Sequence, residues 1–231
     1  MYVPPTPAPP PAPPVSLQGL ASQAPGEQSP PLTRPVAIAT ALSVRHDDLD
    51  VLAGHRATVL GVLRIGLHGA SSSQLQGRSP AGKLVKLQTR FHRRWRTVAE
   101  THTGARGRYR LRYRTGAIGS ESARVRFAGD AGDRGSHRRL GRLNVYRLAG
   151  ASWYGGGGSL ACGGWLTSAT LGVANKTLPC GTLVTLRYGG HELRVPVIDR
   201  GPYVAGREYD LTEATKRTLG FEGTGDVWAT R

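Results

Sequence analysis

Alternating apolar and polar positions run through the middle of the chain and predict β-strands there. In the segment 108–114, with the sequence RYRLRYR, the apolar residues face one way and every arginine faces the other. The segments 84–91 and 124–127 repeat this period of two residues, which is typical of a half-buried strand and not of a helix. Such patterns predict short strands over 37–44, 56–65, 84–91, 95–101, 108–114, 124–127 and 140–148.

Turns rich in Gly, Ser and Asp separate these expected strands. About seven short strands at this spacing are typical of an immunoglobulin-like sandwich of roughly 100 residues. We therefore predict an all-β chain in which residues 36–147 form an Ig-like β-sandwich.

The C-terminal region, residues 148–231, predicts a second unit of short strands. Two apolar-rich segments, 182–188 and 192–198, flank the pair Gly189 and Gly190 and are expected to form a hairpin. About six short strands of this kind around one helix fit a small closed barrel.

The helix of that unit is expected at 211–217. Asp210 and Glu213 have the spacing of a capping box at its start, with Asp210 as the N-cap. Gly220 is expected to end it.

The first 35 residues differ in composition from the rest. They hold 12 of the 16 prolines of the chain. Such a segment has little apolar surface to bury and favours extended backbone, so residues 1–35 are expected to be a disordered, Pro-rich tether. The start at Met1 lacks the basic and apolar regions of a secretory signal. Either the protein is cytoplasmic or its true start lies upstream.

The positive charge is concentrated in the middle region. The formal net charge is +16, and residues 36–147 contribute 22 Lys+Arg against 7 Asp+Glu, a net of +15. An Arg-rich face would attract a polyanion, such as nucleic acid or an anionic wall polymer. The alternative is a solvated face made Arg-rich by a GC-rich genome, since Arg outnumbers Lys 27 to 4.

Two classes of partner are not expected. The sequence carries no motif for specific nucleic-acid recognition. It has no stretch approaching the roughly 18 apolar residues that span a membrane.

A series of motifs in the C-terminal region gives the sharpest functional signal. They are ASWYG at 151–155, LACGG at 160–164, ANKTLPCGT at 174–182, VIDRGPY at 197–203 and YDLT at 209–212. In this order they resemble rare lipoprotein A (RlpA), a family of septal lytic transglycosylases that shares its barrel with the expansins. The resemblance covers roughly residues 149–231. It implies that residues 148–231 form a six-stranded double-psi β-barrel with one short helix.

The two cysteines, Cys162 and Cys180, resemble a pair in the secreted actinobacterial branch of that family, which implies a disulfide between them. A disulfide requires an oxidising compartment. The resemblance therefore favours a secreted, cell-wall protein whose signal sequence is missing from this chain. Neither cysteine has a histidine partner at zinc spacing, and we expect no metal and no cofactor.

Asp199 is the candidate catalytic residue. It follows an apolar strand and precedes Arg200 and Gly201, so its carboxylate lies where the strand enters a tight turn and can reach a ligand. By resemblance, it aligns with the catalytic-site aspartate of the RlpA motif. The alternative is an aspartate that is bonded to turn amides or paired with Arg200.

Two other polar groups of active family members are replaced in this chain. Those members have a glutamate, which is a leading candidate for the acid, where this sequence has Gly164, and a histidine where it has Asn175. The resemblance implies that a lytic transglycosylase can use one group in turn as acid and base. The replacements nevertheless move the protein toward expansins, which loosen walls without efficient hydrolysis.

Flat aromatic side chains suit pyranose rings, and several lie in these motifs. The candidate substrate-binding residues are Trp153, Tyr154, Trp165, Asn175, Arg200 and Tyr203. Because Trp153 and Tyr154 are neighbours on a strand, one is expected to point inward and one outward. For Trp165 and Tyr203, a core position and a groove position both stay open.

The sequence thus predicts a secreted cell-wall protein whose barrel binds peptidoglycan glycan strands and cleaves them as a lytic transglycosylase around Asp199. The alternative is a non-catalytic, expansin-like wall-binding module on an Ig-like spacer. A nucleic-acid-binding protein would explain the charge but not the barrel. The expected partners are peptidoglycan or another wall polysaccharide, with anionic wall polymers as a second partner of the Arg-rich sandwich.

Overall fold

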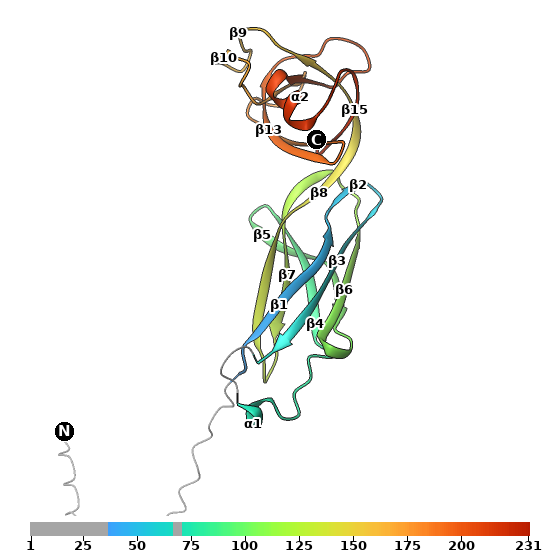
Figure 1. The fold of residues 1–231 in the computed structure, drawn as a ribbon, viewed down its shortest axis with the longest axis vertical. Coiled ribbons are helices and arrows are strands. Elements are labelled where there is room, and N and C mark those ends of the chain that lie inside the picture. The colour runs from blue at the N-terminus through green and yellow to red at the C-terminus, as the bar shows by residue number, and fades with distance from the viewer. Residues whose placement is uncertain (1–36, 67–70) are drawn as a thin grey trace, which may run out of the picture. The chain divides into compact units, whose positions relative to one another are not determined.

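A computed structural model describes residues 37–66 and 71–231, which are mainly β-strands (Figure 1). The predicted tether, residues 1–35, lies outside the described residues. Within the described ranges the helical elements are α1 (Ser72–Leu75), η1 (Ala105–Gly107) and α2 (Glu213–Leu219). None of the helices in these ranges is long and apolar enough to cross a membrane. The all-β fold class is confirmed.

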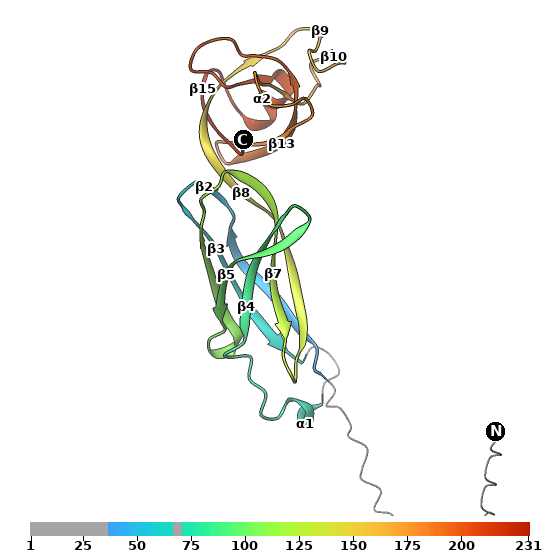
Figure 2. The same ribbon diagram turned by 180° about the vertical axis from the view of Figure 1, so that it is seen from behind.

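Two sheets form the N-terminal half of the described chain (Figure 2). One has the strand order β1–β3–β6; in the other, β5, β4, β7 and β8 are neighbours and β2 pairs along β8. The strands are β1 (Thr40–Asp48), β2 (Asp50–Leu52), β3 (Arg56–Ile65), β4 (Leu84–Phe91), β5 (Arg94–His102), β6 (Arg108–Arg114), β7 (Gly119–Gly129) and β8 (Arg134–Tyr154).

An apolar core lies between these two sheets. In β6, Tyr109 and Leu111 are buried and the intervening arginines are exposed, so the alternating pattern predicts the two faces correctly. Val59 of β3 and Val125 of β7 are fully buried in the same cluster. Each fully buried side chain of this kind stabilises the fold by about 1.5–3 kcal/mol. The result is a two-layer β-sandwich, and its Ig-like subtype stays a prediction.

β8 is a single strand of 21 residues that continues from the sandwich into the C-terminal barrel (Figure 1). It pairs with β7 as far as Val145 and with β2 as far as Tyr146. From Arg147 it pairs with β15, and from Ala151 also with β14. The pairing partners therefore change beside the predicted domain boundary. Independent folding of residues 36–147 and 148–231 stays a prediction.

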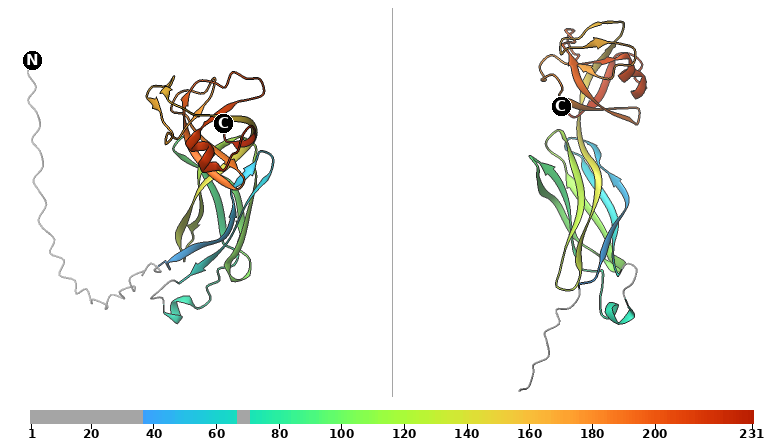
Figure 3. Two further views of the ribbon diagram at one scale, coloured as in Figure 1. Left: turned by 45° about the horizontal axis from the view of Figure 1, so that its top comes forward. Right: turned by 90° about the vertical axis from the view of Figure 1, so that its left-hand side faces the viewer.

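Six strands close into the C-terminal barrel (Figure 3). The order around the barrel is β14, β11, β13, β12, β15 and β8, and pairing of β14 with β8 closes the ring. The predicted six-stranded barrel is confirmed, and β9 and β10 form a separate small sheet. The strands are β9 (Gly158–Ser159), β10 (Trp165–Leu166), β11 (Val173–Ala174), β12 (Leu183–Tyr188), β13 (His191–Asp199), β14 (Tyr209–Thr212) and β15 (Gly225–Ala229).

Helix α2 begins later than the sequence predicts. Its N-cap is Thr212, whose hydroxyl accepts a backbone N–H bond from the first turn, so the prediction of Asp210 as the cap is wrong. Asp210 lies in β14 because Tyr209 and Leu211, on either side of it, are buried in the barrel core. The predicted helix end is confirmed, since Gly220 is the C-cap with a φ of 67°.

A buried polar cluster lies where β8 passes from the sandwich to the barrel. Tyr146 is fully buried, and its hydroxyl donates to Glu192 Oε2 of β13 over 2.6 Å. Asn144 Nδ2 donates to Asp50 Oδ1 over 2.8 Å and to Glu192 over 3.1 Å. Burial raises the pKa of Glu192; the Tyr146 hydrogen bond opposes this shift and the nearby Asp50 adds to it. The cluster ties side chains of the sandwich to one of the barrel.

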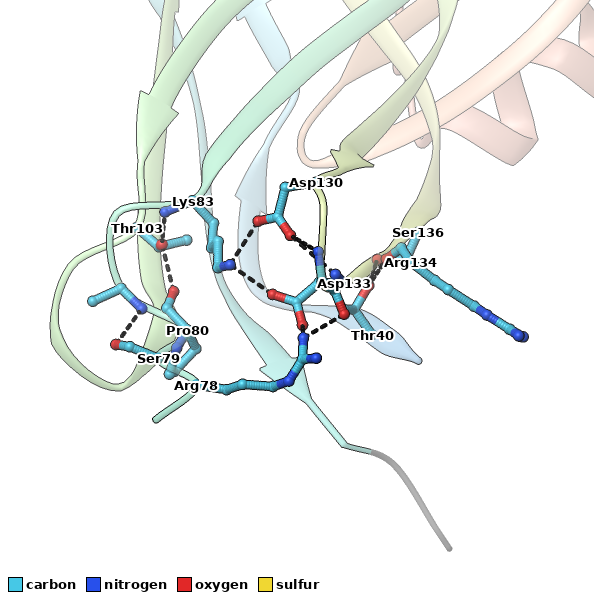
Figure 4. A network of polar contacts seen from close by, with 12 residues as sticks. Thr40, Arg78, Ser79, Pro80, Lys83, Thr103, Asp130, Asp133, Arg134 and Ser136 are labelled. Atoms are coloured by element: carbon cyan, nitrogen blue, oxygen red, sulfur yellow. Dashed lines mark hydrogen bonds and ion pairs between the residues drawn. The ribbon is translucent and has the colours of Figure 1, made fainter. Parts of the chain in front are cut away.

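A second polar network fastens the segment before β4 to the turn between β7 and β8 (Figure 4). Asp133 is 2% exposed and binds two cations: Arg78 at 3.0 Å and Lys83 at 2.6 Å. Lys83 also donates to Asp130 over 2.6 Å, and Asp130 Oδ1 accepts two backbone N–H groups of the turn. Burial acts to lower the pKa of Lys83, but the hydrogen bonds to both aspartates outweigh it and raise the pKa.

Asp133→Asn should destabilise the protein because it leaves Arg78 and Lys83 without their shared charge. Removing one partner of a buried ion pair costs about 3–5 kcal/mol. Both cations keep some access to water. We therefore expect a loss of about 2–3 kcal/mol, seen by circular dichroism as a fall in Tm of roughly 4–10 °C.

Asp130→Asn is the matched control for this network. The side chain of Asp130 is 39% exposed, and an asparagine keeps its bonds to the turn amides, so the expected loss is below about 1 kcal/mol. Equal losses for the two variants would contradict the central role of Asp133.

Candidate active site

A shift in strand register at the end of β13 sets the position of Asp199. Val197 pairs with Val173 of β11, but the next residue of β11, Ala174, pairs with Asp199 and leaves Ile198 unmatched. In a regular strand, Val197 and Asp199 would face the same side, and Val197 lies in the barrel core. The extra residue therefore turns Asp199 to the outer face.

Asp199 and Asp210 lie in one row across four neighbouring strands. Ala174 pairs with Asp199 on one side and with Asp210 on the other, and Asp210 pairs with Ser152 of β8. Paired residues present their side chains to the same face, and neighbouring strands are about 4.8 Å apart, so roughly 10 Å separates the two aspartate Cα atoms. Ser152 Oγ donates to Asp210 Oδ1 over 2.8 Å. Only the small side chain of Ala174 lies between the two carboxylates in this row.

Backbone amides hold the carboxylate of Asp199. Its Oδ1 accepts hydrogen bonds from Ala161 N and Arg200 N, both over 2.9 Å. The loop of Ala161 is itself fixed, since Cys162 N donates to a carbonyl of β13 over 3.2 Å and Cys162 is bonded to Cys180. The predicted disulfide is confirmed. Of the two structural alternatives for Asp199, the bonds to turn amides form, whereas the guanidinium of Arg200 binds elsewhere.

Arg200 and Asn175 hold the loop between β11 and β12. Arg200 Nη1 donates to the carbonyls of Asn175 and Leu178 over 3.0 and 2.8 Å, and Nη2 lies 3.1 Å from Cys180 Sγ. The Asn175 side chain is buried; its Oδ1 accepts two backbone N–H bonds of the loop, and its Nδ2 donates to the Glu208 carbonyl. Both residues thus have structural partners, and substrate binding by either stays a prediction.

The hydroxyl of Tyr154 is buried and, among the residues that the structure describes, has no hydrogen-bond partner. Tyr154 lies two residues after Ser152 on β8, on the same face as the aspartates. Burial raises its pKa, the negative charges of Asp199 and Asp210 raise it further, and the approach of the hydroxyl to the Asp199 carboxylate adds to the shift. The phenol therefore keeps its proton at neutral pH and offers a donor beside two carboxylates.

Asp210 is a further candidate for the site, although its sequence spacing had indicated a helix cap. Burial raises its pKa; the Ser152 hydrogen bond and the charge of Arg207 oppose this shift, and the charge of Asp199 adds to it. A protonated Asp210 is therefore available at a higher pH than for an ordinary aspartate. Apolar and polar residues alternate over Tyr209, Asp210 and Leu211, which indicates a strand. The capping-box spacing of Asp210 and Glu213 also fits the start of a helix, and the prediction followed that spacing.

The aromatic candidates lie on the surface of this region. Trp165 is 67% exposed and Tyr203 is 80% exposed, so neither belongs to the core. Trp153 is also exposed, with the ammonium of Lys216 4.1 Å from its ring centroid, whereas the hydroxyl of the neighbouring Tyr154 is buried. The two neighbours therefore differ in exposure, and the assignment of one of them to the inside of the barrel stays a prediction. Sugar binding by these faces stays a prediction.

Gly164 occupies an exposed, left-handed position beside the site. Its φ is 89°, and a Cβ there would meet no atom within 4 Å. Glycine adopts this backbone without cost, whereas a glutamate would strain it. The loop conformation therefore matches the glycine that is present, and no acid projects from this position.

Comparisons with known proteins concern the C-terminal part of the chain. The lytic transglycolase family matches residues 148–228. The probable endolytic peptidoglycan transglycosylase RlpA of Aquifex aeolicus (strain VF5) is 41% identical over 82 residues, or 33% of this chain and 36% of that protein. The protein of the same name from Synechocystis sp. is 38% identical over 80 residues, or 32% of this chain and 25% of that protein. The chain thus spans about a third or less of the curated relatives it matches.

Among solved structures, Streptomyces papain inhibitor is 27% identical and matches with a TM-score of 0.31, over 37% of this chain and 94% of that chain.

The closed ring of six strands and the family match define the C-terminal part as a double-psi β-barrel. Residues 148–228 are an RlpA-like domain of this class, and the resemblance inferred from the motifs is confirmed. The actinobacterial subtype stays a prediction.

Replacing both cysteines, Cys162→Ala with Cys180→Ala, should destabilise the barrel. The cross-link joins residues separated by 18 positions. Closing a loop of that size stabilises a fold by about 3 kcal/mol in the chain-entropy model. Denaturant unfolding should show a lower midpoint for the double variant than for the oxidised protein. A reductant should shift the parent protein and leave the variant unchanged, and identical midpoints for both proteins would contradict the prediction.

Proposed function

We propose that the protein acts on the cell wall outside the cytoplasm, where its barrel binds peptidoglycan glycan strands and cleaves them slowly as a lytic transglycosylase. The observation that carries the proposal is the outer face of the barrel, on which Asp199, Asp210 and the free hydroxyl of Tyr154 converge. The family match and the relatives' names support the substrate class. The disulfide supports an oxidising, extracytoplasmic location.

Two carboxylates in different environments suit acid–base chemistry at one glycosidic bond. An acid gives its proton to the glycosidic oxygen as the bond from C1 to that oxygen breaks. A base takes the proton of the 6-hydroxyl of the same sugar, whose oxygen attacks C1. The products are a 1,6-anhydro sugar and a released hydroxyl, and no water is consumed.

The environments of the two aspartates assign these roles. Asp210, with its raised pKa, holds a proton that it can donate. Asp199, fixed by two backbone amides, is placed to accept the proton of the sugar hydroxyl. Tyr154, on β8 beside the strand of Asp210, donates a hydrogen bond to substrate. The exposed rings of Trp153, Trp165 and Tyr203 offer flat faces to neighbouring sugars.

Asp199→Asn and Asp210→Asn should each lower the release of 1,6-anhydro products from purified peptidoglycan by about 10²–10⁴-fold, because each removes a proton-transfer group and keeps the side-chain shape. Mass spectrometry of the soluble products measures the loss. Asp226→Asn, an exposed aspartate of β15, is the control and should keep the parent rate. The parent rate should also fall as pH rises through the raised pKa of Asp210, because its acid form is then lost. Release of 1,6-anhydro products by Asp199→Asn at the parent rate would contradict the assignment of the active site.

A non-catalytic, expansin-like role is the second candidate. It is favoured by the absence of an acid at Gly164 and by the structural bonds that occupy the Asn175 side chain. In that case the parent protein would pellet with peptidoglycan and release no 1,6-anhydro products at any pH.

The sandwich supplies an electrostatic part of wall binding in this proposal. Arg108, Arg110, Arg112 and Arg114 lie along one face of β6, all exposed. A row of like charges attracts a polyanion, and salt screens exposed charges over about 8 Å at physiological ionic strength. Such arginines would suit an anionic wall polymer.

Changing these four arginines to glutamine should weaken sedimentation with purified walls several-fold at low salt and flatten its dependence on salt. The matched control changes the same four residues to lysine, which keeps the charge and should keep most of the binding. Salt-independent binding by the parent protein would rule out this role, as would unchanged binding by the glutamine variant.

A further inference from the structure

One outer face of the sandwich, on the sheet that contains β5, β4, β7 and β8, is densely basic. The fully buried pair Leu87 and Val125 marks the inner face of this sheet, so the alternate pairs along the strands face outward. They form three rows across the four strands, which begin on β5 at Glu100, Thr97 and Trp95. The cations in these rows are Lys86, Arg90, Arg124, Arg126, Arg139 and Arg142.

The protein leaves most of this charge without a counter-charge. Glu100 is the one carboxylate in the three rows, and it lies 3.5 Å from Lys86. The five arginines of the rows form no ion pair with any carboxylate in the described ranges. Burial lowers the pKa of Arg124, and the positive charges of Arg126 and Arg139 lower it further. Because an arginine still keeps its proton at neutral pH, these three charges repel one another, and an anion between them would relieve the repulsion.

Arg124 is held in place by two uncharged side chains. Gln88 is 7% exposed; its Oε1 accepts a hydrogen bond from Arg124 Nε over 2.9 Å, and its Nε2 donates to Thr97 Oγ1 over 3.2 Å. The guanidinium carbon of Arg124 lies 4.0 Å from the ring centroid of Trp95. Within the described chain, Nε is the only nitrogen of this guanidinium that has a hydrogen-bond partner. Both Nη groups are therefore open to a ligand, and a guanidinium fixed in this way loses little conformational freedom when an anion binds.

A β-bulge places Arg139 beside Arg124. Ala123 of β7 pairs with Gly141 of β8, but the next residue, Arg124, pairs with Arg139 and leaves Leu140 unmatched. In a regular ladder Leu140 would lie opposite Arg124 on the outer face, and Arg139 would turn toward the core. With the bulge, Leu140 packs against the core and Arg139 is exposed on the outer face. The extra residue thus brings a second guanidinium next to the one that Gln88 holds.

We propose that this outer face binds a linear polymer of phosphodiester units, with Arg124 at the centre of the site. A guanidinium group bonds to two phosphate oxygens at once, which suits the open Nη edge of Arg124. The Cα atom of Arg139 lies about 5 Å from that of Arg124 across the strands, and that of Arg126 about 7 Å along its strand. All three guanidinium groups therefore reach one stretch of polymer.

A nucleic acid fits this face less well than a polymer without bases. Proteins bind single strands by stacking the bases on free aromatic rings. Trp95 is the only Phe, Tyr or Trp in the three rows, and the guanidinium of Arg124 already covers one face of its ring. A base that stacked there would displace the central cation of the site. The face is therefore suited to a polymer that is recognised through its phosphates alone.

The place of this polymer in the cell wall rests on the proposed function, in which the β6 arginines of the other sheet also attract an anionic wall polymer. Binding of a soluble phosphate polymer can be measured without peptidoglycan. Failure of glycan cleavage would therefore leave the result for this face standing.

The test is a fluorescence anisotropy titration of a labelled, short poly(glycerol phosphate) with the full chain at several salt concentrations. We expect saturable binding that weakens as salt rises. Arg124→Gln should bind about fivefold more weakly at low salt and should lower the slope of log Kd against log salt by about 0.7, the value for one phosphate contact on a single strand. Arg45→Gln, which removes an exposed arginine of β1 in the other sheet, is the matched control and should keep the affinity and slope of the parent.

Trp95→Leu tests the positioning of Arg124 separately from its charge. All the cations stay in this variant, so the slope against salt should stay at the parent value, while the affinity falls about threefold because the guanidinium is no longer held. Arg139→Gln is a second charge variant whose exposed side chain has no hydrogen-bond partner in the described chain, and it should lower the slope as Arg124→Gln does. Thermal unfolding followed by circular dichroism confirms that each variant is folded.

Four outcomes would overturn the proposal. The first is the absence of saturable binding of poly(glycerol phosphate). The second is tenfold tighter binding of an oligodeoxythymidylate with the same number of phosphates, which would mark a nucleic-acid surface. The third is equal binding of polyglutamate of the same charge, which would show no preference for phosphate. The fourth is an equal loss for Arg45→Gln and Arg124→Gln, which would show that only the net charge of the protein matters.

Discussion

One strand, β8, joins the sandwich and the barrel of this protein, because it forms hydrogen bonds with strands of both. One part of β8 pairs with β7 and β2, and the rest pairs with β15 and β14. At the change of partners, the buried hydroxyl of Tyr146 is bonded to Glu192 of the barrel. Rotation of the barrel about β8 would break this bond and leave polar groups unsatisfied, which is costly in a buried setting. The same strand contributes Tyr154 to the candidate active site.

The outer face of the barrel concentrates groups that do not stabilise one another. Asp199 and Asp210 repel each other, and the buried hydroxyl of Tyr154 has no partner among the described residues. Ordinary packing would replace such groups, and their accumulation on one face is typical of a site that works on a ligand. The register shift at Ile198 creates this arrangement, because without it Asp199 would point into the core.

The proposed activities use two kinds of chemistry on the cell wall. The barrel face offers carboxylates and exposed aromatic rings, which suit an uncharged sugar chain and proton transfer to its linking oxygen. The sandwich offers guanidinium groups along β6, which suit anions. A wall that presents sugar chains and anionic polymers together would engage both parts of the chain in this proposal.

The sequence by itself determined most of the architecture of this protein. Alternation placed the strands of the sandwich, with 56–65, 84–91 and 108–114 matching β3, β4 and β6, because a strand with one buried face must repeat every two residues. The motifs determined the barrel, the disulfide and the position of Asp199. Tertiary structure decided what depends on contacts between distant segments. The row that joins Asp199, Asp210 and Ser152 needs the pairing of β13, β11, β14 and β8. Asp210 shows most clearly what local sequence cannot determine. Its spacing to Glu213 fits a helix cap. Burial of Tyr209 and Leu211 in the barrel core outweighs that local preference and keeps Asp210 in a strand.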